Sequence, residues 1–200
     1  MTAEMLNINA EICRMFSVMF YNPKESFLTE PSTIGELSEL LKTLNKDLNF
    51  DAEKLIKDTL LTDETELLLD YAALFIGPYQ LQAPPYGSVY LDKAKRLNDE
   101  STAAVTDIYR QFGLDVESSM NEPADHIAIE LEFIHTALIM IDNKKAAGED
   151  TSCDEQVLTD FIANYFKPFA TQMSALMVKN ASTNFYKTIG KLLSQYSQSL

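Results

Sequence analysis

The amino-acid sequence predicts an all-α protein, a single globular bundle of about eight to ten helices. Apolar residues recur at steps of three and four in nearly every segment, which is the spacing of one helix face. No alternation of apolar and polar residues, the pattern of a strand, is longer than four residues. The length of 200 residues fits one large domain, so we expect residues 1–200 to form a single domain.

Helices in the first half are predicted from apolar stripes and from the residues that begin and end them. The stripes cover residues 5–19, 34–44, 51–60, 62–76 and 104–112. Thr33 with Glu36 has the spacing of a capping box, and Asp51 and Thr62 are suited to cap the helices that follow them. The predicted ends are at Asn22-Pro23, Gly77-Pro78 and Gly113.

A long central helix is predicted to begin at Pro123, with Asn121 or Glu122 as its cap, because proline suits the first turn of a helix. One apolar stripe on it consists of Ile127, Leu131, Ile134, Leu138 and Ile141, and a second of Ile129, Phe133 and Met140. A helix that is apolar on two sides is surrounded by others, so we expect it at the centre of the bundle.

The polar segment 142–155 is predicted to be an exposed loop and a hinge, because it contains Gly148 among charged and small residues. Ser152 and Glu155 have capping-box spacing ahead of the next helix. Pro168 is expected to separate that helix from the following one. The last helix is predicted from Phe185, Ile189, Leu192, Leu193 and Tyr196.

Sixteen basic and thirty acidic residues give a formal net charge of −14, which disfavours nucleic acid and anionic membranes as partners and favours a basic one. Residues 58–92 and 111–143 contain no lysine or arginine; a solvated acidic surface is the alternative explanation. The apolar runs are far shorter than the roughly 20 residues of a membrane span. The N-terminus lacks the basic start of a signal peptide, and the two cysteines have no zinc-site spacing. We therefore expect a cytoplasmic protein that is not an integral membrane protein.

Residues 71–91, YAALFIGPYQLQAPPYGSVYL, combine the end of an amphipathic helix with a stiff loop. Tyr71, Leu74 and Phe75 share one face of that helix. The helix must end at Gly77, because the proline that follows disfavours a helical conformation there.

The loop that follows this helix is rich in proline and tyrosine. Pro84 and Pro85 stiffen its backbone beside Tyr86. Exposed aromatic side chains on a stiff loop suit a peptide-binding surface, whereas a buried connection between helices is the alternative. A recognition loop has to present its side chains before the ligand arrives, so we expect Tyr86 and Pro85 to be partly exposed.

The segment EPADH places Glu122, Pro123, Asp125 and His126 together at the start of the predicted central helix. The two carboxylates can act as acceptors for guanidinium groups, which favour bidentate carboxylate partners. Alternatively, they merely offset the helix dipole.

A metal site is the weaker interpretation of the histidines. His126 and Glu130 stand four residues apart, and Glu132 and His135 form a single ExxH, but di-metal bundles need two such motifs and two further carboxylates. His135, among apolar neighbours, is better explained as a hydrogen-bonded histidine in or near the core. No P-loop, dinucleotide-binding glycine motif, GxSxG or HExxH occurs.

Three blocks of the sequence together resemble the TorD/DmsD family of redox-enzyme maturation chaperones, with NarJ-type proteins more distant. The blocks are residues 71–78 (YAALFIGP), 83–92 (APPYGSVYLD) and 122–126 (EPADH), followed by 184–186 (NFY) and Leu192. The chain departs from DmsD-like members in having no tryptophan; tyrosines stand in the blocks where those members often carry it.

The resemblance implies a cytoplasmic, all-helical, non-enzymatic chaperone, and no cofactor is expected. Such proteins bind the twin-arginine signal peptide of a molybdopterin oxidoreductase, such as a DMSO or TMAO reductase, and in some cases its apo form. They delay export by the twin-arginine (Tat) pathway until the cofactor is inserted. The signal-peptide-binding residues implied are Tyr71, Leu74, Phe75, Gly77, Pro84, Pro85, Tyr86, Ser88, Glu122, Pro123, Asp125 and His126.

Two alternatives remain open at this point. One is an assembly protein that binds a folded partner without reading its leader, and the other is a small metalloprotein that uses His126 and Glu130. The expected oligomeric state is a monomer or a homodimer that exchanges helices about the 142–155 segment.

Overall fold

The computed structural model describes residues 2–24, 31–44, 57–58, 61–77, 80–117 and 121–200. Every regular element in these ranges is a helix, accompanied by one isolated antiparallel bridge between Tyr86 and His126, so the predicted all-α class is confirmed. Contacts divide the chain into two compact units, Met1–Ser17 with Tyr86–Phe169 and Val18–Pro85 with Ala170–Leu200. The single domain over residues 1–200 stays a prediction.

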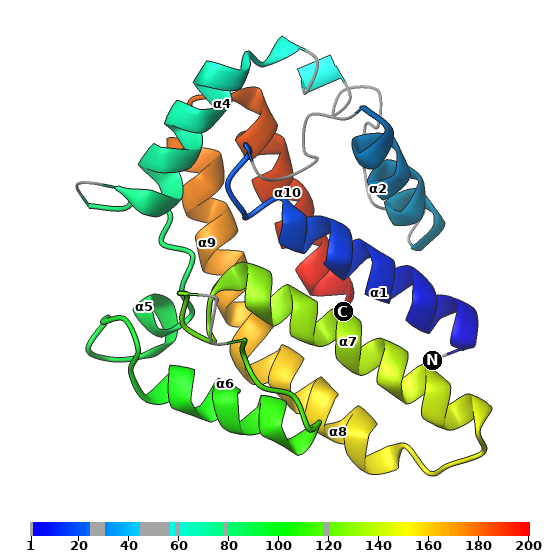
Figure 1. Cartoon of the computed structure of the whole chain (residues 1–200). Coiled ribbons are helices and arrows are strands. Elements are labelled where there is room, and N and C mark those ends of the chain that lie inside the picture. The colour runs from blue at the N-terminus through cyan, green and yellow to red at the C-terminus, as the bar shows by residue number, and fades with distance from the viewer. Residues whose placement is uncertain (1, 25–30, 45–56, 59–60, 78–79, 118–120) are drawn as a thin grey trace. The chain divides into compact units, whose positions relative to one another are not determined.

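The first unit is built around one long helix, α7. Its elements are α1 (Ala3–Val18), α5 (Ser88–Leu91), α6 (Glu100–Gln111), α7 (Ile127–Ala146), α8 (Ser152–Phe161) and the π-helical segment η3 (Ile162–Phe166). Phe133 of α7 packs edge-on against Phe161 of α8, with ring centroids 4.9 Å apart, and lies 4.4 Å from the ring of Tyr109 in α6. Helices α1 and α7 lie side by side in Figure 1. His135 of α7 hydrogen-bonds the carbonyl oxygen of Ala10 in α1 over 2.9 Å. The predicted central helix and the predicted role of His135 are both confirmed.

The start of α7 differs from the prediction. The helix begins at Ile127, not at Pro123, and its N-cap is His126. The Nδ1 atom of His126 accepts a hydrogen bond from the amide of Ala128 over 3.2 Å, which supplies one of the acceptors that a helix start lacks. The four residues before His126 are not free to join the helix, because this segment pairs with the Tyr86–Ser88 loop.

The predicted loop over 142–155 is wrong at both ends. Helix α7 continues to Ala146 and α8 starts at Ser152, so only five residues connect them. Gly148 has a φ of 77°, the left-handed conformation that ends many helices and that glycine adopts without strain. The predicted capping box is also wrong, because the hydroxyl of Thr151, not Ser152, donates to Glu155.

Pro168 does not separate two helices. Helix α8, segment η3 and helix α9 (Lys167–Asn180) follow one another without interruption. A proline inside a helix cannot donate to the carbonyl four residues earlier and collides with it. The π-helical turn immediately before α9 changes that spacing, which accommodates the ring within a continuous helix.

The second unit carries the remaining helices. They are α2 (Pro31–Leu44), α4 (Glu64–Tyr71), the π-helical segment η2 (Ala72–Ile76), most of α9, and α10 (Asn184–Ser199). Asp70 at the end of α4 accepts hydrogen bonds from the amides of Ser182 and Thr183 and from the Thr183 hydroxyl, at 2.6–3.0 Å. This buried carboxylate therefore satisfies the start of α10 and ties α4 to it. Gly190 lets α10 approach α9, since a Cβ there would lie 3.0 Å from Cβ of Met177.

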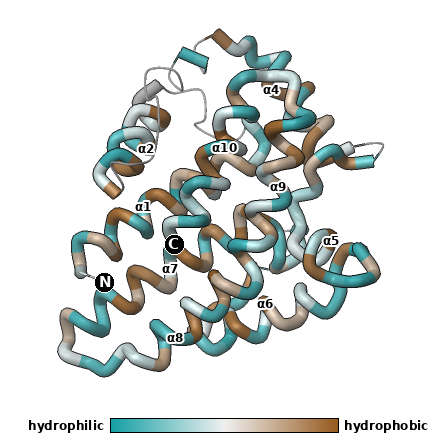
Figure 2. The backbone as a smooth tube through the Cα atoms, turned by 180° about the vertical axis from the view of Figure 1, so that it is seen from behind, coloured by the Kyte–Doolittle hydropathy of each residue, from teal (hydrophilic) through white to brown (hydrophobic). Residues whose placement is uncertain are grey.

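Several predicted boundaries are close to those observed. Helix α2 begins at Pro31 rather than after Thr33, and α4 is capped by Asp63 rather than Thr62. The predicted ends at Gly77 and Gly113 are confirmed, with φ of 87° and 71°. The helix predicted from Asp51 to Leu60 lies largely outside the described residues. The hydrophilic connection between α5 and α6 stands out in teal in Figure 2, in contrast to the apolar stretches of the helices.

Candidate functional site

Two distant segments of the first unit meet in a small hydrogen-bonded cluster. The amide of Gly87 donates to the carbonyl of Asp125 over 2.9 Å, and the amide of Ser88 donates to Oδ2 of Asp125 over 2.7 Å. The hydroxyl of Tyr86 donates to Glu122 over 2.9 Å, and the Tyr86 ring contacts His126 edge-on at 5.4 Å. We call these residues, together with Glu130, the Asp125 cluster.

The outer part of the Asp125 cluster reaches solvent. Glu122 is exposed, and Tyr86 and Pro123 are half-buried. The expected partial exposure of Tyr86 is therefore confirmed. This surface therefore presents an aromatic ring and a carboxylate that are joined by a hydrogen bond.

His126 lies where the EPADH segment ends and α7 begins. It is buried, and burial lowers its pKa from 6.5 to about 4, so the imidazole is neutral near pH 7. A neutral imidazole keeps an acceptor nitrogen, which is what the cap on the Ala128 amide requires. The role of His126 in the fold is thus that of an uncharged N-cap.

The inner part of the Asp125 cluster consists of two carboxyl groups without solvent. Asp125 and Glu130 are both 0% exposed. Among the described residues, Oδ1 of Asp125 and both carboxyl oxygens of Glu130 have no hydrogen-bond partner, and neither group forms an ion pair with a base. Burial, and secondarily the neighbouring Asp125, raise the pKa of Glu130 well above its ordinary value. This environment therefore favours the protonated, neutral form of Glu130.

Gly87 makes the close approach of the loop to these acids feasible. A Cβ at this position would lie 3.3 Å from Oε1 of Glu130 and 3.5 Å from Cβ of Asp125. A larger residue would need the carboxyl group to move, because 3.3 Å is tighter than most contacts of a Cβ. The glycine thus allows the loop backbone to cover both acids.

The apolar half of the predicted site belongs to the second unit. Tyr71, Leu74 and Phe75 are buried, at 8%, 0% and 4% exposed. The rings of Tyr71 and Phe75 form an aromatic cluster with Phe20 and Tyr186, with centroids 5.4–6.4 Å apart, and the Tyr71 hydroxyl donates to the carbonyl of Phe20. These side chains stabilise the core of this unit.

The proline-rich loop is only partly presented. Pro84 is half-buried, but Pro85 is buried, so the expected exposure of Pro85 is wrong. The reason is local, since the amide of the buried Ala83 donates to the carbonyl of Leu74 over 2.9 Å and holds the loop against η2. Gly77 has φ 87° and ψ −177°, a conformation that favours glycine, and ends η2 before the loop.

Of the twelve predicted site residues, five therefore join through hydrogen bonds or ring contacts in the Asp125 cluster. These are Tyr86, Ser88, Glu122, Asp125 and His126. Pro123 lies within the same segment, where its carbonyl accepts from the amide of His126, and the other six belong to the second unit. Sequence reasoning weighed Glu130 only as a metal ligand and missed its place beside Asp125. The signal that could have found it is a carboxylate among the apolar residues in the first turns of α7.

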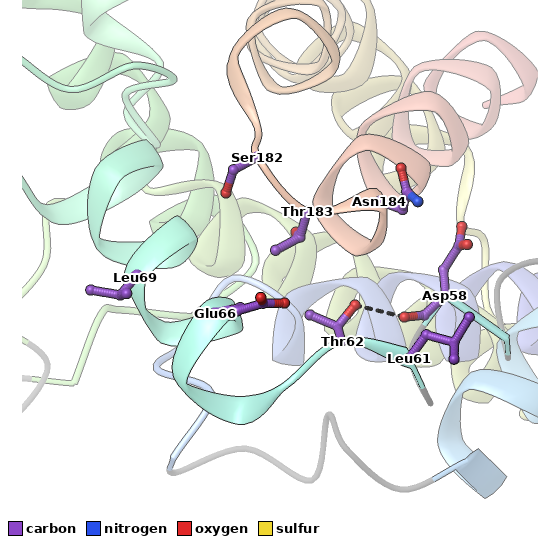
Figure 3. A pocket seen from close by; sticks show the side chains of 8 residues that line it. All are labelled: Asp58, Leu61, Thr62, Glu66, Leu69, Ser182, Thr183 and Asn184. Atoms are coloured by element: carbon purple, nitrogen blue, oxygen red, sulfur yellow. Dashed lines mark hydrogen bonds between the residues drawn. The ribbon is translucent and has the colours of Figure 1, made fainter.

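A separate pocket of about 390 Å³ opens in the second unit, between the start of α4 and the start of α10 (Figure 3). Asp58 and Glu66 supply its charges, and the Thr62 hydroxyl donates to the carbonyl of Asp58. Leu61 and Leu69 on its lining are 72% and 68% exposed. Within the described ranges, no group of three or more histidine, cysteine, aspartate or glutamate side chains is placed to hold a metal ion.

Comparison with known proteins decides the family. The family described as nitrate reductase delta subunit matches residues 34–175, which is more than half of the chain. The chain belongs to this family. In the part of the chain that the structure describes, no helix is both long and apolar enough to cross a membrane.

Relatives in this family include named chaperones. The chain is 29% identical over 175 residues to the chaperone protein TorD of Aliivibrio salmonicida, covering 86% of this chain and 78% of that protein. It is 28% identical over 186 residues to the Tat proofreading chaperone DmsD of Salmonella paratyphi A, covering 92% and 84%. A solved structure from Archaeoglobus fulgidus, described as a redox enzyme maturation protein, shares the fold with a TM-score of 0.59 at 19% identity, covering 94% and 93% of the two chains.

Proposed function

We propose that this protein is a cytoplasmic, non-catalytic chaperone for a molybdopterin oxidoreductase. It binds the twin-arginine leader of the enzyme's precursor and delays Tat export until the cofactor has been inserted. Membership of the nitrate reductase delta subunit family supports this role, as do relatives named TorD chaperone and Tat proofreading chaperone. The apo form of the enzyme's body is a further partner in this proposal.

The observation that carries the proposal is the junction of two separately predicted segments. Tyr86 and Ser88 come from the APPYGSVYLD block, and Glu122 and Asp125 come from the EPADH block; the four are hydrogen-bonded in one cluster. A twin-arginine leader combines guanidinium groups with an apolar run. Carboxylates are suitable partners for the guanidinium groups, and an exposed aromatic ring is suitable for the apolar run.

Charge supports the same ligand. The net charge of −14 attracts a basic leader and raises its association rate. Glu122 offers a solvent-accessible carboxylate beside the half-buried ring of Tyr86. Salt should therefore weaken leader binding without abolishing it, since the apolar contact persists at high ionic strength.

The apolar run of the leader is proposed to contact a second group of residues, namely Tyr71, Leu74, Phe75, Gly77, Pro84 and Pro85. Because the first three side chains are buried in their aromatic cluster, a peptide can reach them only if part of this cluster opens. This requirement predicts that mutations of these three residues change stability as well as binding.

The proposal is tested by pull-down with two baits from the reductase whose gene neighbours this one. One bait is the isolated leader fused to an unrelated carrier, and the other is the full precursor. A chaperone that reads the leader retains both baits, and loses the carrier fusion when the two arginines become lysines. Retention of the full precursor alone would favour an assembly protein that binds a folded partner.

The oligomeric state that we infer is a monomer or a helix-exchanged homodimer with its hinge within 142–155. The connection between α7 and α8 is five residues long and contains Gly148 in a left-handed conformation, which is compatible with a change of direction there. Light scattering across a concentration series separates the two states, and lengthening this connection would shift the balance of a helix-exchanged dimer.

A further inference from the structure

Glu130 has no role in the fold that its surroundings explain. Buried polar groups in proteins are almost always hydrogen-bonded, and buried carboxylates are almost always paired with a base. Glu130 is 0% exposed, and both of its carboxyl oxygens lack partners among the described residues. Asp125, in the segment that precedes α7, is equally buried and has one carboxyl oxygen without a partner among the described residues.

Two hydroxyl groups in the segment that follows Gly87 also lack partners in the part of the chain that the structure describes. The hydroxyl groups of Ser88 and Tyr90 are buried and, within the described ranges, accept or donate no hydrogen bond. The amide of Ser88 donates to Asp125. The Tyr90 ring packs against Phe169, and Phe169 lies next to Gly87, 3.5 Å from where a Cβ would stand. Three carboxyl oxygens and the Ser88 hydroxyl thus belong to residues of the Asp125 cluster and lack hydrogen-bond partners among the described residues.

A guanidinium group has the complementary chemistry. It carries five N–H donors in a planar fork and a permanent positive charge, and it forms paired hydrogen bonds with carboxylates. We propose that Glu130 is the second carboxylate of the leader-binding site, and that Glu130 and Asp125 together receive an arginine side chain of the leader. This inference rests on the proposed function and adds to it a buried receptor beneath the exposed Tyr86 and Glu122.

The loop that covers the acids is the element that has to move. Three hydrogen bonds hold it to the EPADH segment, namely Tyr86 to Glu122, Gly87 to the Asp125 carbonyl and Ser88 to the Asp125 carboxylate. An arginine that enters replaces some of these bonds and provides donors for the oxygens that lack them.

The charge state of Glu130 gives this receptor a measurable signature. Asp125 from the segment before α7 and Tyr109 from α6 interact electrostatically with Glu130, and neither is a base. His126, the N-cap four residues before Glu130, has a pKa lowered to about 4 by burial and is uncharged near pH 7. Burial and Asp125 favour the protonated form of the Glu130 carboxyl group, whereas an arginine beside it favours the ionised form. Binding therefore converts the carboxylic acid to a carboxylate paired with the guanidinium group, and the released proton goes to the buffer.

The test is calorimetric titration near pH 7 in two buffers of different ionisation enthalpy. The ligand is a synthetic peptide with two consecutive arginines followed by an apolar run, and its twin carries two lysines. We expect the parent protein to release a proton on binding the arginine peptide. Glu130→Gln, which resembles the protonated acid, should release none and bind the arginine peptide about tenfold more weakly or worse.

One control variant, one replacement variant and one spectroscopic measurement accompany the titration. Glu66→Gln makes the same chemical change at an exposed site in the second unit, and should leave the proton release intact. Glu130→Leu removes both oxygens with similar volume and replaces Glu130→Gln if thermal melting shows that variant to be unfolded. Difference infrared spectroscopy should show a protonated carboxyl band that disappears on peptide binding and is absent from both variants at position 130.

Two results would overturn the inference while leaving the proposed function intact. One is tight binding of the arginine peptide to the parent protein with no proton released. The other is a folded Glu130→Gln protein that binds and releases protons as the parent does. If the parent binds neither peptide, the proposed function itself fails and the receptor fails with it.

Discussion

The backbone amide of Ser88 donates a hydrogen bond of 2.7 Å to Oδ2 of Asp125, across 37 residues of sequence. Both groups are fully buried, so this bond is not in competition with water. It fixes the loop that begins at Tyr86 to the segment that ends in the N-cap of α7. The loop and the carboxylate are therefore coupled, and a substitution in either should change the stability of the other's structure.

The first prediction concerns this bond alone. Asp125→Ala should lower the hydrogen-exchange protection of the Ser88 amide about tenfold or more, because hydrogen bonds to charged groups contribute on the order of 1.5–3 kcal/mol. Exchange monitored by NMR gives the protection of that single amide. Ser88→Ala is the matched control, since the hydroxyl it removes has no partner among the described residues. Unchanged protection of the Ser88 amide in Asp125→Ala would contradict the assigned bond.

The second prediction separates the ring of Tyr86 from its hydroxyl group. Tyr86→Phe removes the bond to Glu122 and keeps the ring that a peptide contacts, so its affinity for the leader should stay close to that of the parent. Tyr86→Ala removes the ring and should weaken arginine and lysine leaders alike, by roughly tenfold. Fluorescence anisotropy with both peptides measures this. Equal affinity of Tyr86→Ala and the parent would show that the ring does not touch the peptide.

The third prediction concerns acid stability through His126. The unfolded protein binds a proton at this residue near pH 6.5 and the folded protein only near pH 4, so protonation favours the unfolded state. The stabilisation is fully present above pH 6.5 and is lost as the pH falls from 6.5 towards 4, a difference of about 3 kcal/mol.

The matched variant for this prediction is His126→Asn, because asparagine is a good N-cap but does not titrate. Urea unfolding of both proteins between pH 4 and 7 gives the free energies. The parent should lose stability relative to His126→Asn as the pH falls. Parallel curves would show that His126 is protonated as easily in the folded state as in the unfolded one.

The fourth prediction has the opposite sign and concerns Glu130. The unfolded protein loses this proton near pH 4.5, whereas the folded protein keeps it to a much higher pH. Ionisation of the unfolded state then lowers the free energy of unfolding progressively as the pH rises above 4.5. Glu130→Gln should be more stable than the parent at neutral pH, by a margin that grows with pH. A margin that does not depend on pH would mean that Glu130 is ionised in the folded protein.

The helices could be predicted where burial is periodic. The stripe from Ile127 to Ile141 and the stripe of the last helix from Phe185 to Tyr196 are buried as expected, because an apolar face leaves a helix few other places to pack. Helix ends were less predictable, since Thr62 and Asp63 are both suitable caps and only the hydrogen bond to Thr65 decides between them.

The remaining differences arise from contacts that a local pattern does not contain. Pro168 fits a continuous helix only because a π-helical turn precedes it, and no sequence rule places that turn. Helix α7 begins after His126 and not at Pro123, because a loop 36 to 40 residues earlier pairs with the segment that contains Pro123. Five residues of the candidate site, Tyr86, Ser88, Glu122, Asp125 and His126, could be named from the sequence. The burial of Asp125 and the place of Glu130 beside it could not, because both depend on packing between distant segments.

The most direct test of the account is the preference for arginine over lysine in the leader. Asp125→Asn keeps an acceptor for the Ser88 amide and removes the charge, so it should melt like the parent or at a slightly higher temperature. It should bind the Arg-Arg peptide about tenfold more weakly and the Lys-Lys peptide nearly as the parent does, because the bidentate charge-assisted pair is lost. Anisotropy titrations of both peptides with both proteins measure this. If folded Asp125→Asn binds both peptides as the parent does, Asp125 serves only the fold and the arginine-binding role assigned to it is wrong.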